Sequence, residues 1–311
     1  MSEPDDDRTA SLMTPARLAQ LKVRPQAAAS PTAWLDQMAA DAGSGHVRRL
    51  LELRQQLETV VRAGEGELRP LATACQGLHD ALERVEFAQL QPRGWLARAT
   101  GKGKQAASAF AQQVERVQRA AEDLHDDVKD LLRKQSAQAA TDRMLLEFGA
   151  EVRALEKIME QGTRWLQDMR NQLKVRMAAG GDPAVQQQVQ QDNARCELLV
   201  ERLKVLRTVV SATQRAMERA RAALAGRGAL LASVQQLLDG EWKAVRQKIA
   251  VVAKAAGSGP ASEDVDRAGR ARKGLQGLLQ QAGQDCGAAQ ANEQAAADEL
   301  AALQGPLQAA A

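Results

Sequence analysis

Apolar residues recur at alternating steps of three and four along most of the chain from residue 46 onward. This spacing puts them at the a and d positions of a heptad, which line one side of an α-helix. One such seam comprises Leu68, Leu71, Cys75, Leu78, Leu82 and Val85. Others run from Phe110 to Leu131, from Phe148 to Leu173 and from Cys196 to Val252. The pattern predicts an all-α fold built of long helices.

The strongest turn signal is Gly180-Gly181-Asp182-Pro183, where glycines end one helix and a capping Asp and a Pro start the next. It separates two segments of equal length, residues 105–178 and 183–256. Because the connection is short, the two helices are expected to pack as antiparallel neighbours. We therefore expect an elongated antiparallel coiled-coil hairpin over residues 105–256, with its turn at 179–183 and with flanking helices packed as a bundle.

Prolines and glycines divide the rest of the chain. Four of the nine prolines fall within the first 31 residues, in an acidic and then Ala/Ser-rich stretch that predicts a disordered tail over residues 1–30. The expected order after this tail is N-terminal helices (31–90), a linker (91–104), the hairpin, a second linker (257–261), an Ala-rich C-terminal helix (262–304) and a tail (305–311).

Polar and glycine-containing stretches leave two points open in the long helices. The polar patch at 133–143 and the glycines at 226–228 allow each helix to be either continuous or broken there. Gln186–Gln191 and Asn193, near the start of the second long helix, either specify the register from buried positions or face solvent.

Composition favours long helices over other folds. Aromatic residues make up only 2% of the 311 residues, with no Tyr, whereas a compact globule normally fills its core with aromatic side chains. The 42 basic and 39 acidic residues are interspersed and give a net charge of +3. Such mixing is typical of a solvated helix surface and differs from the concentrated basic patch of a nucleic-acid-binding protein. No nucleic acid partner is therefore expected.

Residues suited to catalysis do not converge in the sequence. The three histidines form no metal-binding pattern (His46, His79 and His125). Gly101-Lys102-Gly103-Lys104 lacks the spacing of a phosphate-binding loop. We therefore expect a non-enzymatic protein with no catalytic residue, no cofactor and no metal.

The three cysteines, Cys75, Cys196 and Cys286, are odd in number and widely spaced, which fits neither a disulfide framework nor a zinc pattern. They fall on or beside seam positions, which indicates buried small side chains. An activated thiolate is the alternative, and it requires exposure and a nearby cation.

Residues 91–104, which we call the basic segment, break the helical pattern. No acidic residue occurs between Glu86 and Glu115. The candidate contact residues are four cations around two apolar side chains: Arg93, Trp95, Leu96, Arg98, Lys102 and Lys104. Cations beside a Trp suit anionic lipid headgroups or an acidic partner. The alternative is that Trp95 plugs one end of the bundle while the charges face solvent.

The order of elements resembles that of the TelA (toxic anion resistance) family of bacterial cytoplasmic proteins. The matching residues are Leu90-Gln91-Pro92, Gly94-Trp95-Leu96, Phe110, residues 114–118 and residues 206–213, so the resemblance covers residues 70–256. The chain departs from the family pattern in having no Tyr after the linker. It also has Arg133-Lys134-Gln135-Ser136 where the family tends to place an Asp-Asn pair.

The resemblance implies a divergent family member with a role in tolerance of tellurite or related stress and without an established enzymatic activity. The expected function is that of a coiled-coil protein acting through protein partners or at the inner membrane surface, with a homo-oligomer also open. The alternative is a scaffold or spacer in a bacterial secretion, partition or defence assembly. The acidic N-terminus and the lack of a long apolar run predict a cytoplasmic protein.

Overall fold

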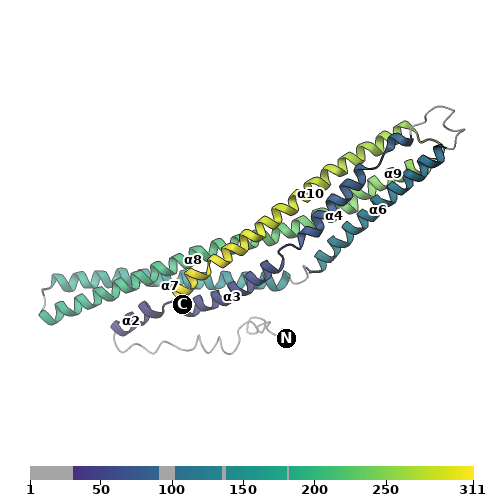
Figure 1. The fold of residues 1–311 in the computed structure, drawn as a ribbon. Coiled ribbons are helices and arrows are strands. Elements are labelled where there is room, and N and C mark those ends of the chain that lie inside the picture. Colours follow the sequence, from purple (N-terminus) through teal and green to yellow (C-terminus); the bar gives the residue numbers. More distant parts are fainter. Residues whose placement is uncertain (1–30, 91–101, 135–137, 181) are drawn as a thin grey trace, which may run out of the picture. The chain divides into compact units, whose positions relative to one another are not determined.

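A computed structural model describes residues 31–90, 102–134, 138–180 and 182–311, and every regular element in these residues is a helix (Figure 1). The side chains of residues 31–35, 102–104 and 138–139 are not among those described, and the expected disordered tail, residues 1–30, lies outside the described residues. The first elements are α2 (Pro31–Asp41), α3 (Ser44–Ala63), α4 (Leu68–Glu83) and the 3₁₀ helix η2 (Phe87–Leu90). They are followed by α6 (Lys102–Lys134), α7 (Gln138–Ala178), α8 (Pro183–Leu237), the π-helix η4 (Leu238–Trp242), α9 (Lys243–Ala255), α10 (Ser262–Ala302) and α11 (Gln304–Ala310). The prediction of an all-α helical bundle is confirmed.

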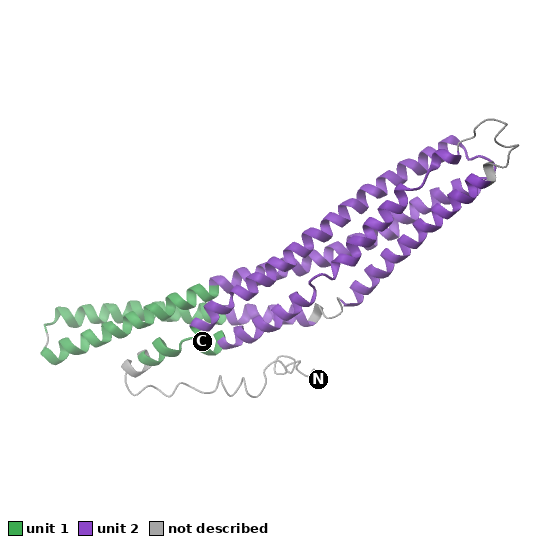
Figure 2. Cartoon of the chain, in the orientation of Figure 1, with its two compact units in different colours: residues 1–47, 153–210, 310–311 green, residues 48–152, 211–309 purple. Residues whose placement is uncertain are grey.

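The chain divides into two compact units (Figure 2). Unit 1 contains residues 1–47, 153–210 and 310–311, and unit 2 contains residues 48–152 and 211–309. The boundaries fall inside α3, α7, α8 and α11. Residues 105–256, expected as one hairpin domain, are therefore shared between the two units: residues 153–210 belong to unit 1 and the remainder to unit 2.

Unit 2 is a bundle in which α4 packs against both α6 and α10, and α10 packs against α9 (Figure 1). The seam predicted on α4 forms the centre of its core: Leu68, Leu71, Cys75, Leu78 and Leu82 are each 0% exposed. The seam residues of α6, α9 and α10 belong to the same cluster. Alternating steps of three and four bury one side of each helix because that spacing follows the helical repeat.

Unit 1 joins α2 to parts of α7 and α8. Arg202 donates two hydrogen bonds to the carbonyl oxygen of Ala42, at 3.0 and 2.9 Å. Arg195 pairs with Asp36 at 2.9 Å. The turn between α2 and α3 uses Gly43, whose φ of 77° lies in the left-handed region that favours glycine.

The structure answers one of the two points left open in the long helices, because α8 is continuous through residues 226–228. At the other, α6 extends to Lys134 and α7 begins at Gln138, and the residues between them lie outside the described part. The described polar residues 186–191 and 193 are exposed. The buried polar residue there is Asp192, which accepts hydrogen bonds from Gln188 and Arg195 at 3.1 and 3.2 Å.

The expected C-terminal tail, residues 305–311, is wrong. Residues 304–310 form α11, and the side chains of Leu307 and Ala310 are both 0% exposed. Leu303, Leu307 and Ala310 continue the apolar spacing of α10 past Pro306. A proline within the first turn of a helix removes no intrahelical hydrogen bond, so Pro306 does not prevent α11 from forming.

None of the described helices is both long enough and apolar enough to cross a bilayer.

Candidate functional site

The basic segment is only partly described. Arg93, Trp95, Leu96 and Arg98 lie outside the described residues. Lys102 and Lys104 lie in the first turn of α6, and their side chains are also outside the described part. The prediction that these six residues form a contact site therefore lies outside the described part. The structure does show the packing of the residues on either side of the segment.

Two phenylalanines fix these ends to the core of unit 2. Phe87 of η2 and Phe110 of α6 have ring centroids 5.7 Å apart, with the ring planes inclined at 52°. Phe110 and Leu90 are buried, at 0% and 4% exposure. The backbone amide of Glu86 donates to Oε1 of Gln113 at 3.0 Å. The chain therefore enters and leaves the basic segment from one aromatic contact.

Arg272 of α10 completes this contact, and we call Phe87, Phe110 and Arg272 the anchor cluster. Its Nη1 donates to the carbonyl oxygen of Val85 at 2.6 Å and reaches that of Leu82 at 3.5 Å. Its Cζ lies 5.4 Å from the centre of the Phe87 ring. A guanidinium at this position satisfies carbonyls at the end of α4 and interacts favourably with the aromatic face. Arg272 is far from the segment in sequence, so no local pattern indicated this role.

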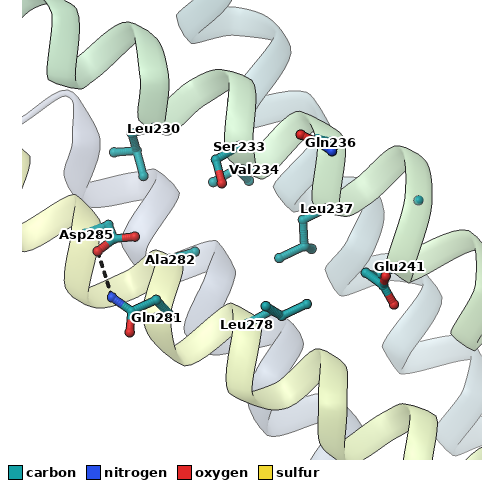
Figure 3. A pocket seen from close by; sticks show the side chains of 11 residues that line it. Leu230, Ser233, Val234, Gln236, Leu237, Glu241, Leu278, Gln281, Ala282 and Asp285 are labelled. Atoms are coloured by element: carbon teal, nitrogen blue, oxygen red, sulfur yellow. Dashed lines mark hydrogen bonds between the residues drawn. The ribbon is translucent and has the colours of Figure 1, made fainter.

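The π-helix η4 lies beside a pocket between α8 and α10 that encloses about 310 Å³ (Figure 3). The apolar side chains of Leu230, Leu237 and Leu278 point into it, and the carboxylates of Glu241 and Asp285 lie at its edges (Figure 3). π-Helical turns are frequent at functional sites. The polar side chains of Ser233, Gln236 and Gln281 share this lining, and Asp285 accepts a hydrogen bond from Gln281 at 2.8 Å. The heptad pattern did not indicate the pocket, because its position depends on the packing of α8 against α10.

A second pocket, of about 380 Å³, lies between α6 and the η4–α9 region. It is lined by His125 and Asp126 of α6 and by Asp239, Trp242 and Lys243 on the other side. Lys243 pairs with Asp239 at 2.9 Å, and its hydrogen bond is the main cause of the lowered pKa of Asp239. His125 and Asp126 are exposed on α6, as expected for a solvated helix surface.

Unit 2 also contains a group of buried charges. Arg227 of α8 lies 3.2 Å from Oε1 of Glu293 on α10 and also pairs with Glu67, just before α4. Burial raises the pKa of Glu293, although the charge of Arg227 opposes this shift. Burial also acts to raise the pKa of Glu67, but hydrogen bonds from Lys134 and Arg227 lower it overall. These contacts connect α8, α10 and the residue before α4, and we interpret them as stabilising the bundle.

The described residues contain one group able to hold a metal ion. The ligand atoms of His79, Asp80 and Glu83 lie within 4.8 Å of one another on α4. Nδ1 of His79 lies 3.2 Å from Oδ1 of Asp80, which also accepts a hydrogen bond from Gln76. The hydrogen bonds bring His79 to Asp80, and Glu83 lies one helical turn from His79, so the short distances need no ion. The spacing of the three residues matches no metal-binding motif, and sequence reasoning therefore did not indicate this group.

All three cysteines are buried, as the seam positions predict. Burial raises the pKa of Cys75 to about 12 and that of Cys286 to about 11. It also raises the pKa of Cys196. Thiols with such pKa values are protonated at neutral pH and therefore poor nucleophiles.

The charge pattern of the sequence indicated the basic segment but not the anchor cluster beside it. The two pockets beside η4 were not indicated either, because they depend on which helices lie side by side. No protein-family model, curated protein or solved structure matches this chain.

Proposed function

We propose that this protein is a non-enzymatic, cytoplasmic interaction protein that binds partners through the surfaces of its long helices. Its resemblance to toxic anion resistance proteins supports a role in tolerance of tellurite or related stress. The alternative is a scaffold or spacer in a bacterial assembly, which needs the same binding surface but not the stress phenotype.

The helical arrangement we propose for this role is an antiparallel coiled-coil hairpin. Contacts within unit 1 support it. A Cβ at Gly162 of α7 would lie 3.1 Å from Cδ2 of Leu203 on α8. Further along α7, Arg170 pairs with Glu197 at 2.9 Å. The partner number on α8 falls as the number on α7 rises, which is the relation between antiparallel helices.

The observation that carries the proposal is a set of large apolar side chains exposed on α7 and α8 of unit 1. Val175, Met177 and Leu198 are 70%, 66% and 61% exposed, and Val185 is 42% exposed. All four lie within 25 residues of one another around the turn at 179–183. Exposed apolar side chains concentrated in one region favour contact with a protein partner. A second copy of the chain is one such partner.

A complementation experiment tests the proposal. The test variant replaces Val175, Met177, Val185 and Leu198 with Ser, and the control makes the same change at exposed apolar positions of unit 2 that line neither pocket beside η4, Val60, Leu146 and Val251. A strain that lacks the gene is supplied with wild type or either variant and challenged with tellurite. We expect wild type and control to restore growth and the test variant to fail, while circular dichroism shows equal helix content.

Equal rescue by the two variants would contradict a role for this surface. Failure of wild-type protein to improve growth would contradict the stress role and favour the scaffold alternative. Retained protein levels, checked by immunoblot, separate loss of binding from loss of the protein.

A further inference from the structure

Cys75 on α4 and Cys286 on α10 lie in one layer of the unit 2 core. Arg227 contacts both Glu67 and Glu293, so the start of α4 lies beside that part of α10. Arg272 contacts the carbonyl oxygen of Val85, so the end of α4 lies beside an earlier part of α10. The two helices therefore run in opposite directions. This register places Cys75 within about one helical turn of Cys286.

The packing around the two thiols allows a close approach of the helices. Both cysteines are 0% exposed and belong to the same hydrophobic cluster. On α10, the buried neighbours one turn before and one turn after Cys286 are Ala282 and Ala289. Such small side chains permit a closer approach on the α10 side, whereas the corresponding neighbours of Cys75 on α4 are Leu71 and Leu78. Burial is the main cause of the raised pKa of Cys75, and the smaller electrostatic contribution of Cys286 agrees with this register.

We propose that Cys75 and Cys286 are a disulfide-forming pair that joins α4 to α10 when the protein meets a two-electron oxidant of the peroxide class. In the first step one thiolate attacks a peroxide oxygen, which gives a sulfenic acid and water. In the second step the other thiol attacks that sulfur, the S–S bond forms and a second water leaves. The sulfur pair loses two electrons and two protons, and the peroxide is reduced to two waters.

Burial sets the rate of this reaction. Both thiols are protonated and shielded in the closed bundle, so oxidation requires a local opening between α4 and α10. Once one sulfur is oxidised, reclosing of the bundle brings the second to it. The product is a covalent link between α4 and α10, the helix that also carries Arg272. This inference goes beyond the proposed function and does not depend on it.

The test uses the folded full-length protein and its third cysteine as an internal control. The protein is treated with hydrogen peroxide and then denatured in the presence of an alkylating reagent, which blocks every remaining free thiol. It is then digested with a protease, and the peptides are identified by mass spectrometry. We expect a linked peptide pair that contains Cys75 and Cys286 and lacks the two thiol hydrogens. Cys196, buried in unit 1, should be recovered in alkylated form.

Thermal unfolding provides a second measurement on the same samples. A cross-link across so many residues is expected to raise the midpoint by roughly 10 °C. C75A and C286A should lose both the link and the shift, and C196A should keep both. If a single-alanine variant fails to fold, the peptide map of wild type decides the question alone. Recovery of Cys75 and Cys286 as separate alkylated peptides, or links to Cys196 at equal yield, would overturn the proposal.

Discussion

Arg227 is a single residue that connects α8, α10 and the turn before α4. Its side chain is 10% exposed and that of Glu293 is 5% exposed, so neither charge is well solvated. Oε2 of Glu293 has no hydrogen-bond partner among the described residues. A buried ion pair of this kind costs desolvation, but removing only one partner leaves an uncompensated charge. Replacing Arg227 and replacing Glu293 should therefore lower the free energy of unfolding by different amounts.

We expect R227M to lower the free energy of unfolding by about 3–5 kcal/mol at pH 7, because it leaves Glu293 charged and unpaired. E293Q should cost no more than about 1 kcal/mol, since Arg227 keeps Glu67. The pKa of Glu293 is raised in the folded state, so folding favours its protonated form and stability falls as pH rises above the ordinary value of 4.5. The deficit of R227M should thus be smaller at pH 5 than at pH 7. Urea unfolding at both pH values measures this, and equal costs for the two variants would contradict it.

Gly43 is a second residue whose identity follows from its surroundings. Besides its positive φ, a Cβ there would lie 2.7 Å from Cδ2 of Leu155, which is fully buried and cannot easily move. We expect G43A to destabilise unit 1 by about 1–3 kcal/mol. G45A is the matched control, because a Cβ at Gly45 meets nothing within 4 Å and Ala favours a helix by about 1 kcal/mol. Thermal unfolding compares them, and a G43A protein as stable as G45A would show that the turn does not need glycine.

At the scale of the elements, the proposed antiparallel hairpin depends on how α7 and α8 pack against each other. Pairs of spin labels within unit 1 distinguish antiparallel from other arrangements. Labels at positions 170 and 197 should be close, since these residues form an ion pair. Labels at 160 and 190 should be further apart, with an offset of about 24 Å along the helix axes, because position 190 lies roughly sixteen residues from the α8 residue opposite 160. The native cysteines are buried, which directs the labels to introduced thiols.

Double electron–electron resonance measures the distance between the two spin labels of each pair. A 160–190 distance equal to or shorter than the 170–197 distance would contradict the antiparallel hairpin. The four labelled positions are polar or charged and exposed, so labelling should leave the helix content unchanged.

At the scale of the whole molecule, the distribution of charge distinguishes the basic segment from the helices. Helix surfaces pair their charges locally, as in Arg119–Glu115 and Lys243–Asp239. The interval between Glu86 and Glu115 has no acid to pair with its cations. Each cation near an anionic surface is worth about 1 kcal/mol, and the attraction is screened over a Debye length of about 10 Å at 0.1 M salt. Weak, reversible and salt-sensitive binding is the expected result.

We expect the protein to co-sediment with anionic vesicles at low salt and to be released at high salt. Replacing Arg93, Arg98, Lys102 and Lys104 with Gln should abolish binding. The control variant replaces Lys129, Lys157, Lys174 and Arg207, which are exposed on helices, and changes the net charge by the same amount. Equal binding by the two variants would assign the attraction to net charge alone and favour the view that the cations of the basic segment simply face solvent.

The sequence by itself determined the helical class, the seam residues and the turn at 179–183, because burial on one side of a helix requires a repeat that is visible locally. It also indicated the basic segment and the burial of the cysteines. Only the tertiary structure decided that α4 lies between α6 and α10, that Arg272 holds the end of α4, and that Cys75 lies near Cys286. Those facts depend on which seam packs against which, and all heptad seams look alike in sequence. Helix α11 was not predicted because proline disrupts the interior of a helix. Pro306 lies in the first turn of α11, where a proline is compatible with the helix.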